Sequence, residues 1–213
     1  MKNLTKIAKI PFLIIILTLS SFYACSNEDD LDFAPDNLMN TDQMITASEK
    51  TSLLFMLEEE KLARDTYTYI NNIWAINEFA NIQKSEQAHM TAIQNLLEAY
   101  KISYTILPEG EFENQDLQNY YNQFVIDGAA SKSNAFQIGA TIEDLDIIDL
   151  QEYISISENN ALIDVFKSLE CGSRNHLRSF VQGITNLGDS YTPQFLTQTA
   201  YDAILQGSQE QCN

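Results

Sequence analysis

The amino-acid sequence predicts an all-α domain built on four long helices. Apolar residues recur at intervals of three and four over four long segments, which is the period of a helix with one buried face. No stretch shows the apolar–polar alternation of a half-buried strand, and only four prolines and seven glycines occur in 213 residues. A chain of this length with 45% hydrophobic residues can enclose one substantial core. We therefore predict a single helical domain over residues 46–206.

Residues 1–24 are typical of a lipoprotein signal peptide. A lysine-containing start precedes an apolar run at residues 10–19, which is too short to span a bilayer. Cys25 follows Ala24, which resembles the lipobox at which bacterial lipoproteins are acylated; ordinary signal-peptidase cleavage is the alternative. Residues 25–45 form an acidic polar tether. Its acidic run at residues 26–30 resembles the surface-export signals of some Gram-negative lipoproteins. These features predict an exported bacterial lipoprotein, attached through Cys25 to the outer membrane or cell surface.

The first long helix is expected to begin at Thr46 and to end near residue 74. Thr46 and Glu49 have the spacing of a capping box, in which each residue bonds the backbone of the other. Glu60 falls in the centre of the apolar stripe of this helix. Glu58 and Glu59 point away from that stripe and are expected to be solvated.

The second long helix is expected to run from Asn77, as its cap, to about Tyr100. Because the preceding link has only a few residues, the first two helices should be antiparallel neighbours. Glu86 and His89 are three residues apart on the apolar stripe, so both project from one face. An exposed helix can carry the same spacing, but a Glu-x-x-His pair directed into a helical bundle is half of a carboxylate-bridged metal site.

The third and fourth long helices carry further metal-binding side chains. The third, at about residues 133–154, places Glu143 and Asp146 on its inner face. The fourth, at about residues 160–185, places His176 on its apolar stripe. The chain has only two histidines, and both therefore lie on predicted inner faces.

Two shorter helices are expected beside the four long ones. Residues 101–115 contain a Pro-Glu-Gly turn signal, and a helix over residues 116–129 follows them. Together these segments form a long crossover between the second and third long helices. The Thr-Pro pair that begins at Thr192 is a cap and first-turn signal for a C-terminal helix that ends near Leu205.

Six side chains that can bind metal should meet on the axis between the long helices: Glu60, Glu86, His89, Glu143, Asp146 and His176. Each buried, unpaired carboxylate costs several kcal/mol, against a total domain stability of about 5–15 kcal/mol. The carboxylates must therefore be protonated, paired with a base or bound to metal. Pairing with Arg64 is the structural alternative. Carboxylates with imidazoles suit iron or manganese, and zinc less closely, so we predict two metal ions, with iron as the first choice.

The predicted helices resemble those of ferritin-like proteins, rubrerythrin among them. The closer resemblance is to an uncharacterised ferritin-like family known as domain of unknown function 2202, over residues 46–206. Four segments carry it: residues 58–67, 85–89, 142–147 and 172–178. The resemblance implies a ferritin-like four-helix bundle with a long helical crossover between helices two and three. It also implies a di-metal centre, with iron as the expected metal, but no known substrate.

One position departs from the pattern of such a centre. The fourth helix should carry a second Glu-x-x-His, but the residue three before His176 is Ser173. A hydroxyl is a poor bridging ligand, and Asp146, one turn after Glu143, is the expected substitute. Without it, the site would hold one metal firmly and the second loosely.

Tyr67 and Tyr153 also lie on inner faces. Core packing explains both, and a redox role beside a metal is the alternative. Cys171 projects away from the His176 stripe, so it is not expected to bind metal. In an exported protein, Cys171 and Cys212 are expected to form a disulfide.

The sequence favours metal binding, with oxidation of ferrous iron by oxygen or peroxide as the associated chemistry. The alternative is a non-catalytic anchored helical interaction or structural module with a vestigial site or a structural zinc ion. The sequence has no Cys-x-x-Cys pair, so the rubredoxin-like electron-delivery module of rubrerythrins is absent. A net charge of −18 argues against nucleic-acid binding. Membrane contact is expected only through the lipid anchor, and an oligomer is compatible with the sequence.

Overall fold

The computed structural model describes residues 44–212, whose regular structure is entirely helical. The all-α prediction is thus confirmed for these residues. The signal peptide, Cys25 and nearly all of the tether lie outside them. No helix between residues 44 and 212 combines the length and apolar character needed to cross a membrane. The helices are α1 (Ala47–Trp74), α2 (Asn77–Ala99), α3 (Gln115–Gly128), α4 (Lys132–Ile156), α5 (Asn160–Asn186) and α6 (Gln198–Gln206).

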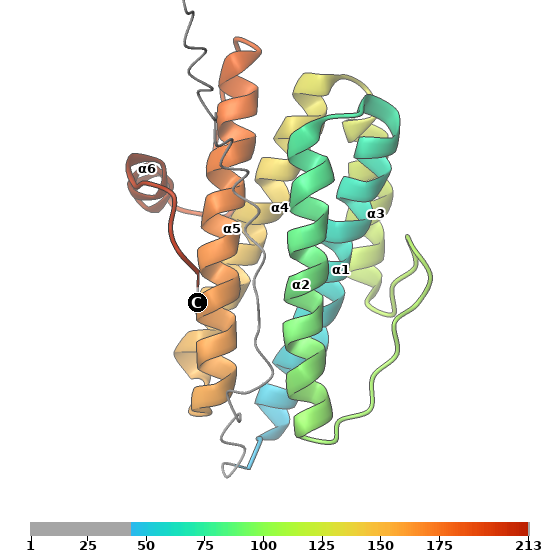
Figure 1. Cartoon of the computed structure of the whole chain (residues 1–213), viewed down its shortest axis with the longest axis vertical. Coiled ribbons are helices and arrows are strands. Elements are labelled where there is room, and N and C mark those ends of the chain that lie inside the picture. The colour runs from blue at the N-terminus through green and yellow to red at the C-terminus, as the bar shows by residue number, and fades with distance from the viewer. Residues whose placement is uncertain (1–43, 213) are drawn as a thin grey trace, which may run out of the picture.

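Four long helices, α1, α2, α4 and α5, lie lengthwise beside one another (Figure 1). α1 packs against α2 and α4, and α5 packs against the same two helices. The chain from the end of α2 runs back along the molecule before it enters α3 (Figure 1). α3 packs on both α1 and α4, so it covers a second side of α1.

A sharp turn joins α1 to α2. Ala75 adopts a left-handed backbone conformation with φ 49°, and its N–H closes α1 on the carbonyl of Asn71. Ile76 takes the cap position of α2, because its carbonyl accepts the first helical hydrogen bond from Ala80 N. Asn77, which the sequence predicted as the cap, is therefore the first helical residue.

The start of α1 has the predicted capping box, and one of its members also reaches across the molecule. Glu49 N donates to Thr46 Oγ1 at 3.2 Å, and Thr46 N donates to Glu49 Oε2 at 2.9 Å. The other oxygen of Glu49 accepts from Ser157 Oγ at 2.7 Å and Asn159 N at 2.9 Å. Glu49 thereby ties the start of α1 to the link between α4 and α5.

Glu49 is expected to make part of the stability of the fold pH-dependent. Burial alone would raise the pKa of Glu49, but the hydrogen bonds that it accepts outweigh burial and lower the pKa from 4.5 to about 2. A lowered pKa contributes stability that is complete above pH 4.5 and is lost as the pH falls toward 2. We expect Glu49→Gln to lower the free energy of unfolding by about 2 kcal/mol at pH 7, because it weakens charge-assisted hydrogen bonds. Urea unfolding at pH 7, 4 and 3 should show the difference from wild type shrinking; a constant difference would contradict this role.

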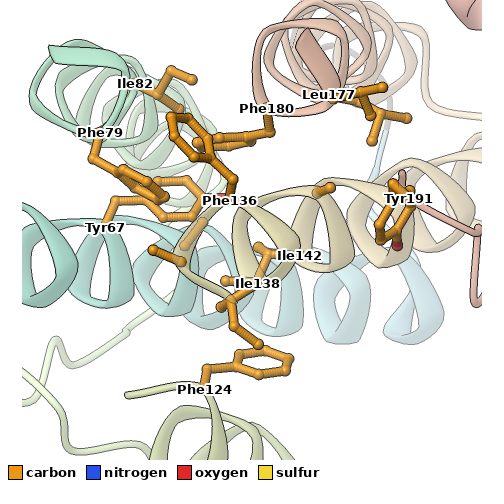
Figure 2. Packing of buried hydrophobic residues seen from close by; sticks show 14 of the residues in the cluster. Tyr67, Phe79, Ile82, Phe124, Phe136, Ile138, Ile142, Leu177, Phe180 and Tyr191 are labelled. Atoms are coloured by element: carbon orange, nitrogen blue, oxygen red, sulfur yellow. The ribbon is translucent and has the colours of Figure 1, made fainter. Parts of the chain in front are cut away.

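The core consists of two apolar clusters that are separated along the helices. Figure 2 shows the rings of Tyr67, Phe79, Phe136 and Phe180 gathered in the first cluster, with Phe79 and Phe180 centred 4.9 Å apart. The second cluster lies toward the other end and includes Leu53, Met56, Met90, Ile93, Leu96, Phe166 and Leu169. On α1, α2 and α5 the predicted metal-binding residues fall between members of the two clusters, and on α4 they lie at the end of the first cluster, just before Leu150 of the second. The site is therefore enclosed by apolar side chains on both sides.

A buried lysine holds the long crossover against α1. Lys61 Nζ lies 2.5 Å from Asp65 Oδ2 and donates to the carbonyls of Pro108 and Glu111 at 2.9 and 3.0 Å. Its ammonium also sits 4.2 Å from the centre of the Phe112 ring. These contacts fix the loop in front of α3 and thus where α3 covers α1.

The C-terminal helix begins later than the sequence predicts. α6 starts at Gln198 with Thr197 as its cap, not at Thr192. The backbone N–H groups of residues 194–196 donate to the carboxylate of Asp144 on α4, at 2.5 to 3.2 Å. These amides are therefore held by a side chain of another helix and do not form a first helical turn.

A disulfide joins Cys171 of α5 to Cys212, as the sequence predicts. Charged contacts accompany it, since Arg174 and Arg178 both bond the carboxylate of Glu210 at 2.6 to 2.9 Å. The tail after α6 is therefore fastened along α5, on the side away from the metal-binding residues.

Candidate metal centre

Two groups of three metal-binding side chains lie in the junction between the apolar clusters, and they share one residue. Glu60, Glu86 and His89 form the first group, and Glu86, Glu143 and His176 form the second. In each group, one ligand atom per residue lies within 4.8 Å of the others, and all the residues are buried. The helical period accounts for this meeting, because it places one face of each long helix toward the common axis.

Glu86 directs one oxygen toward each imidazole. Its Oε2 lies 2.9 Å from His89 Nδ1, and its Oε1 lies 2.9 Å from His176 Nδ1. Glu60 Oε2 is 3.1 Å from the same nitrogen of His89, and Glu143 Oε2 is 3.5 Å from that of His176. Each Nδ1 thus faces two carboxylates, and the arrangement is nearly symmetric about Glu86.

Neighbouring residues orient His176 and Glu143 of the second group. The far nitrogen of His176, Nε2, lies 3.1 Å from Ser85 Oγ. Tyr67 is fully buried, and its hydroxyl donates to Glu143 Oε1 at 2.5 Å. These contacts leave Nδ1 of His176 and the other oxygen of Glu143 turned toward the shared carboxylate.

The charges of the site compensate one another. Burial raises the pKa of Glu60 to about 8, although the nearby imidazole of His89 opposes the rise. Burial alone would lower the pKa of His176, but Glu86 and Glu143 outweigh burial and raise it to about 10. Burial would likewise raise the pKa of Glu86, but the charges of His176 and His89 hold it below its ordinary value. Protons on the imidazoles therefore balance the carboxylates, and a divalent cation at Nδ1 would replace those protons.

Asp146 lies next to the two groups but belongs to neither. Its Oδ2 is 2.5 Å from the hydroxyl of Ser173, the residue that departs from the Glu-x-x-His pattern. Its Oδ1 is buried and accepts no hydrogen bond. The expectation that Asp146 replaces the missing carboxylate remains a prediction.

The structural alternative, an Arg64–carboxylate pair inside the site, does not form. Arg64 instead bonds Asp65 at 2.6 Å and Gln87 at 2.8 Å, both outside the two groups. Tyr153 is also away from them, because its ring packs against Phe55 and Phe166.

The prediction that Glu59 is solvated is wrong, because its side chain is only 1% exposed. The carboxyl group of Asp149 on α4 lies within its hydrogen-bonding reach. Residues three and four positions from Glu59 along α1, such as Phe55 and Leu62, are apolar, and that pattern was the available signal for a second buried face. Because α3 packs on this side of α1, the face is covered.

Gly172 leaves the space that His89 occupies, and we expect its replacement to disturb the first group. A Cβ at position 172 would lie 2.7 Å from His89 Nε2. Gly172→Ala should therefore move the imidazole and weaken metal binding by about 10- to 100-fold. Equilibrium dialysis against Mn²⁺ measures this effect. Gly128→Ala is the matched control, because its Cβ would meet Ile70 at 2.8 Å, remote from the site; equal losses of affinity in both variants would contradict the prediction.

Comparison with known proteins adds three related findings. Residues 49–208 match the model of a family described as an uncharacterized protein domain, DUF2202. The uncharacterized protein MJ0754 of Methanocaldococcus jannaschii is 42% identical over 170 residues, which are 79% of this chain and 92% of that protein. The crystal structure of the hypothetical protein MJ0754 from Methanococcus jannaschii is similar, with a TM-score of 0.77 and 42% sequence identity. That likeness covers 79% of this chain and 97% of the other.

Proposed function

This chain belongs to the DUF2202 family of uncharacterized protein domains, and we propose that it is a ferritin-like di-metal carboxylate protein. Its two metal ions are iron in the first instance, and its proposed activity is the oxidation of ferrous iron by peroxide or oxygen. The observation that carries the proposal is the single carboxylate of Glu86, shared by two buried Glu–Glu–His groups. A carboxylate shared between two such groups is the arrangement that bridges a pair of metals.

The unpartnered atoms of the site fit a pair of cations. Glu86 Oε1 and His176 Nδ1 are 2.9 Å apart, yet they are not aligned as a hydrogen bond, and both lack a hydrogen-bond partner. Glu60 Oε1 is a further buried oxygen without a donor. Buried polar atoms are normally satisfied, and oxygen with imidazole nitrogen is the donor set that suits iron and manganese.

The arrangement of the helices supports the ferritin-like part of the proposal. In ferritin-like carboxylate proteins, two helices each give one Glu and two others each give a Glu-x-x-His pair. Here α1 gives Glu60, α4 gives Glu143 and α2 gives the pair Glu86 and His89. The short α1–α2 link and the long crossover to α4 agree with the same topology.

Two ferrous ions held there would each supply one electron, and two electrons with two protons reduce hydrogen peroxide to two molecules of water, or oxygen to hydrogen peroxide. The residues of the chain would bind the two metal ions, orient the ligand side chains and enclose the site. Glu60 and His89 hold one position, while Glu143 and His176 hold the other. Ser85 and Tyr67 fix the orientation of the second pair, and the two apolar clusters limit access of water.

Anaerobic titration with ferrous iron tests the proposal. We expect two iron ions to bind per chain at the paired groups, and subsequent addition of hydrogen peroxide to consume one peroxide for two irons. Ferric iron is followed by its near-ultraviolet absorption. Asp146→Ala should retain the first iron and weaken the second. Saturation at one iron per chain, or binding of none, would reject the di-metal proposal and favour a non-catalytic structural module.

The membrane anchor is a separate part of the proposal and rests on the sequence around Cys25. We expect Cys25→Ser to shift the protein from the membrane to the soluble fraction, because no acyl chain can then be attached. Detergent partitioning and intact mass measure the change. If the variant and the wild type have the same mass and the same partitioning, Cys25 is not lipidated.

A further inference from the structure

His176 is the side chain of the paired groups that is most open to solvent. Its side chain is 10% exposed. The other four side chains are each between 0% and 2% exposed: Glu60, Glu86, His89 and Glu143. Nδ1 of His176 is itself buried and faces the shared carboxylate, so the exposed part is the remainder of the side chain. Solvent therefore comes closest to the paired groups at His176.

His176 lies in the seam between α2 and α5, where it meets Ser85. α2 and α5 pack against each other much less than α1 packs against α2 or α4 against α5. On the opposite side of the bundle, α3 covers the seam between α1 and α4, and no helix within residues 44–212 covers the α2–α5 seam in this way. An ion that enters between α2 and α5 therefore has no third helix to pass.

The side chains beside His176 in this seam are small, and two of them are polar. Ser85 of α2 is half-buried, and its hydroxyl lies 3.1 Å from His176 Nε2. The residue one turn earlier on α5 is Gly172, which has no side chain to close the seam. Ser179, three residues after His176, is half-buried, and a helical side chain leans over the turn that precedes it. Hydroxyl groups lower the cost of taking a cation out of water, whereas the apolar clusters on the other sides do not.

Both metal positions are within reach of this seam. The rings of His89 and His176 are nearly parallel, at an interplanar angle of 26°, and their centres are 5.6 Å apart. Each ring turns its Nδ1 toward Glu86. We propose that metal ions reach the paired groups between α2 and α5, through an entrance formed by Ser85, His176 and Ser179. This inference rests on the proposed function, because it requires that the paired groups bind metal.

The rates of metal binding and release distinguish an entrance from a residue that only positions a ligand. An obstacle on the path slows both rates by the same factor and leaves the affinity unchanged, because it raises only the barrier. Ser85→Thr keeps the hydroxyl that bonds His176 and adds a methyl group to the entrance. Ser179→Leu leaves Ser85 in place and puts a larger side chain over the same turn. Each variant should slow loading and release by about tenfold, which one clashing side chain can cause.

Mn²⁺ is the probe for both rates. Loading is followed after mixing metal-free protein with Mn²⁺, through the loss of the electron paramagnetic resonance signal of the free ion. Release is followed after mixing loaded protein with excess EDTA, and equilibrium dialysis gives the affinity. Ser155→Leu makes the same kind of change at an exposed position of α4 and should load as wild type does. Circular dichroism verifies that each variant is folded.

A second control blocks the rival path. A pocket of about 550 Å³ lies between α1, α3 and α4, and none of the five residues of the paired groups lines it. Asn119 is exposed in the wall of this pocket. Asn119→Trp should therefore obstruct the pocket and leave the rates of loading and release unchanged.

Each remaining outcome contradicts the entrance in a recognisable way. If Ser85→Thr and Ser179→Leu load and release Mn²⁺ at the wild-type rates, metal does not pass these residues. If they weaken the affinity and the two rates do not change by the same factor, Ser85 and Ser179 only position His176. Slow loading in Asn119→Trp alone would place the path in the pocket. Wild type that binds no Mn²⁺ would reject the proposed function together with the entrance, whereas normal binding at unaltered rates in the variants would reject the entrance alone.

Discussion

Replacing Glu86 with alanine is expected to abolish metal binding at both groups. Its two oxygens lie 2.9 Å from the Nδ1 atoms of His89 and His176, so one substitution removes a ligand from each position. Loss of an outer-shell partner already costs about 10- to 100-fold in metal affinity, and loss of a shared direct ligand should cost at least about 100-fold at each position. Titration with Fe²⁺ under anaerobic conditions should show no binding at the paired groups. Loss of a single ion would show that Glu86 serves only one position.

Two further variants keep this test specific. Glu86→Gln preserves the volume of the side chain and is expected to give the same loss of metal, which excludes a packing defect as the cause. Glu98→Ala removes an exposed carboxylate from the same helix and should leave the stoichiometry unchanged. Thermal unfolding in the presence of a chelator establishes that each metal-free variant is folded. Normal iron content in Glu86→Ala would contradict the assignment of the site.

Replacing Asp144 with asparagine is expected to cause the largest loss of stability. Its carboxylate is fully buried and accepts hydrogen bonds from the backbone N–H groups of residues 194–196 and from the hydroxyl of Tyr191 at 2.8 Å. Asparagine places an N–H₂ group against several of these donors, and each buried donor left unpaired costs about 1–3 kcal/mol. We expect the free energy of unfolding to fall by roughly 3–5 kcal/mol.

Urea unfolding of the metal-free protein measures this loss. Asp164→Asn is the control, because Asp164 is exposed on α5 and its replacement should change the stability by less than about 0.5 kcal/mol. Hydrogen exchange should locate the effect in residues 194–206, since these depend on Asp144 for their attachment to α4. A loss below about 1 kcal/mol would show that water replaces the carboxylate at little cost.

The sequence by itself determined the helices and the inner faces of the four long ones. The boundaries of the four long helices depend mainly on neighbours within one or two turns, and the capping box of Thr46 and Glu49 shows how local that information is. The helical period likewise determines which residues share a face, so the spacing of Glu86 and His89 placed both side chains toward the axis. The five residues of the two paired groups could therefore be named before any packing was known.

Only the tertiary structure decided which helix faces other than the inner ones are covered. It also decided which polar groups pair across helices. Glu59 became buried because α3 packs on α1, and the position of α3 depends on the contacts of Lys61 with a loop about fifty residues away. The start of α6 moved because Asp144 binds the amides of a distant segment. These outcomes arise from contacts between residues far apart in the chain. Local helix propensity carries no information about these contacts, because it depends on residues close in sequence. The contacts form only when the helices pack together.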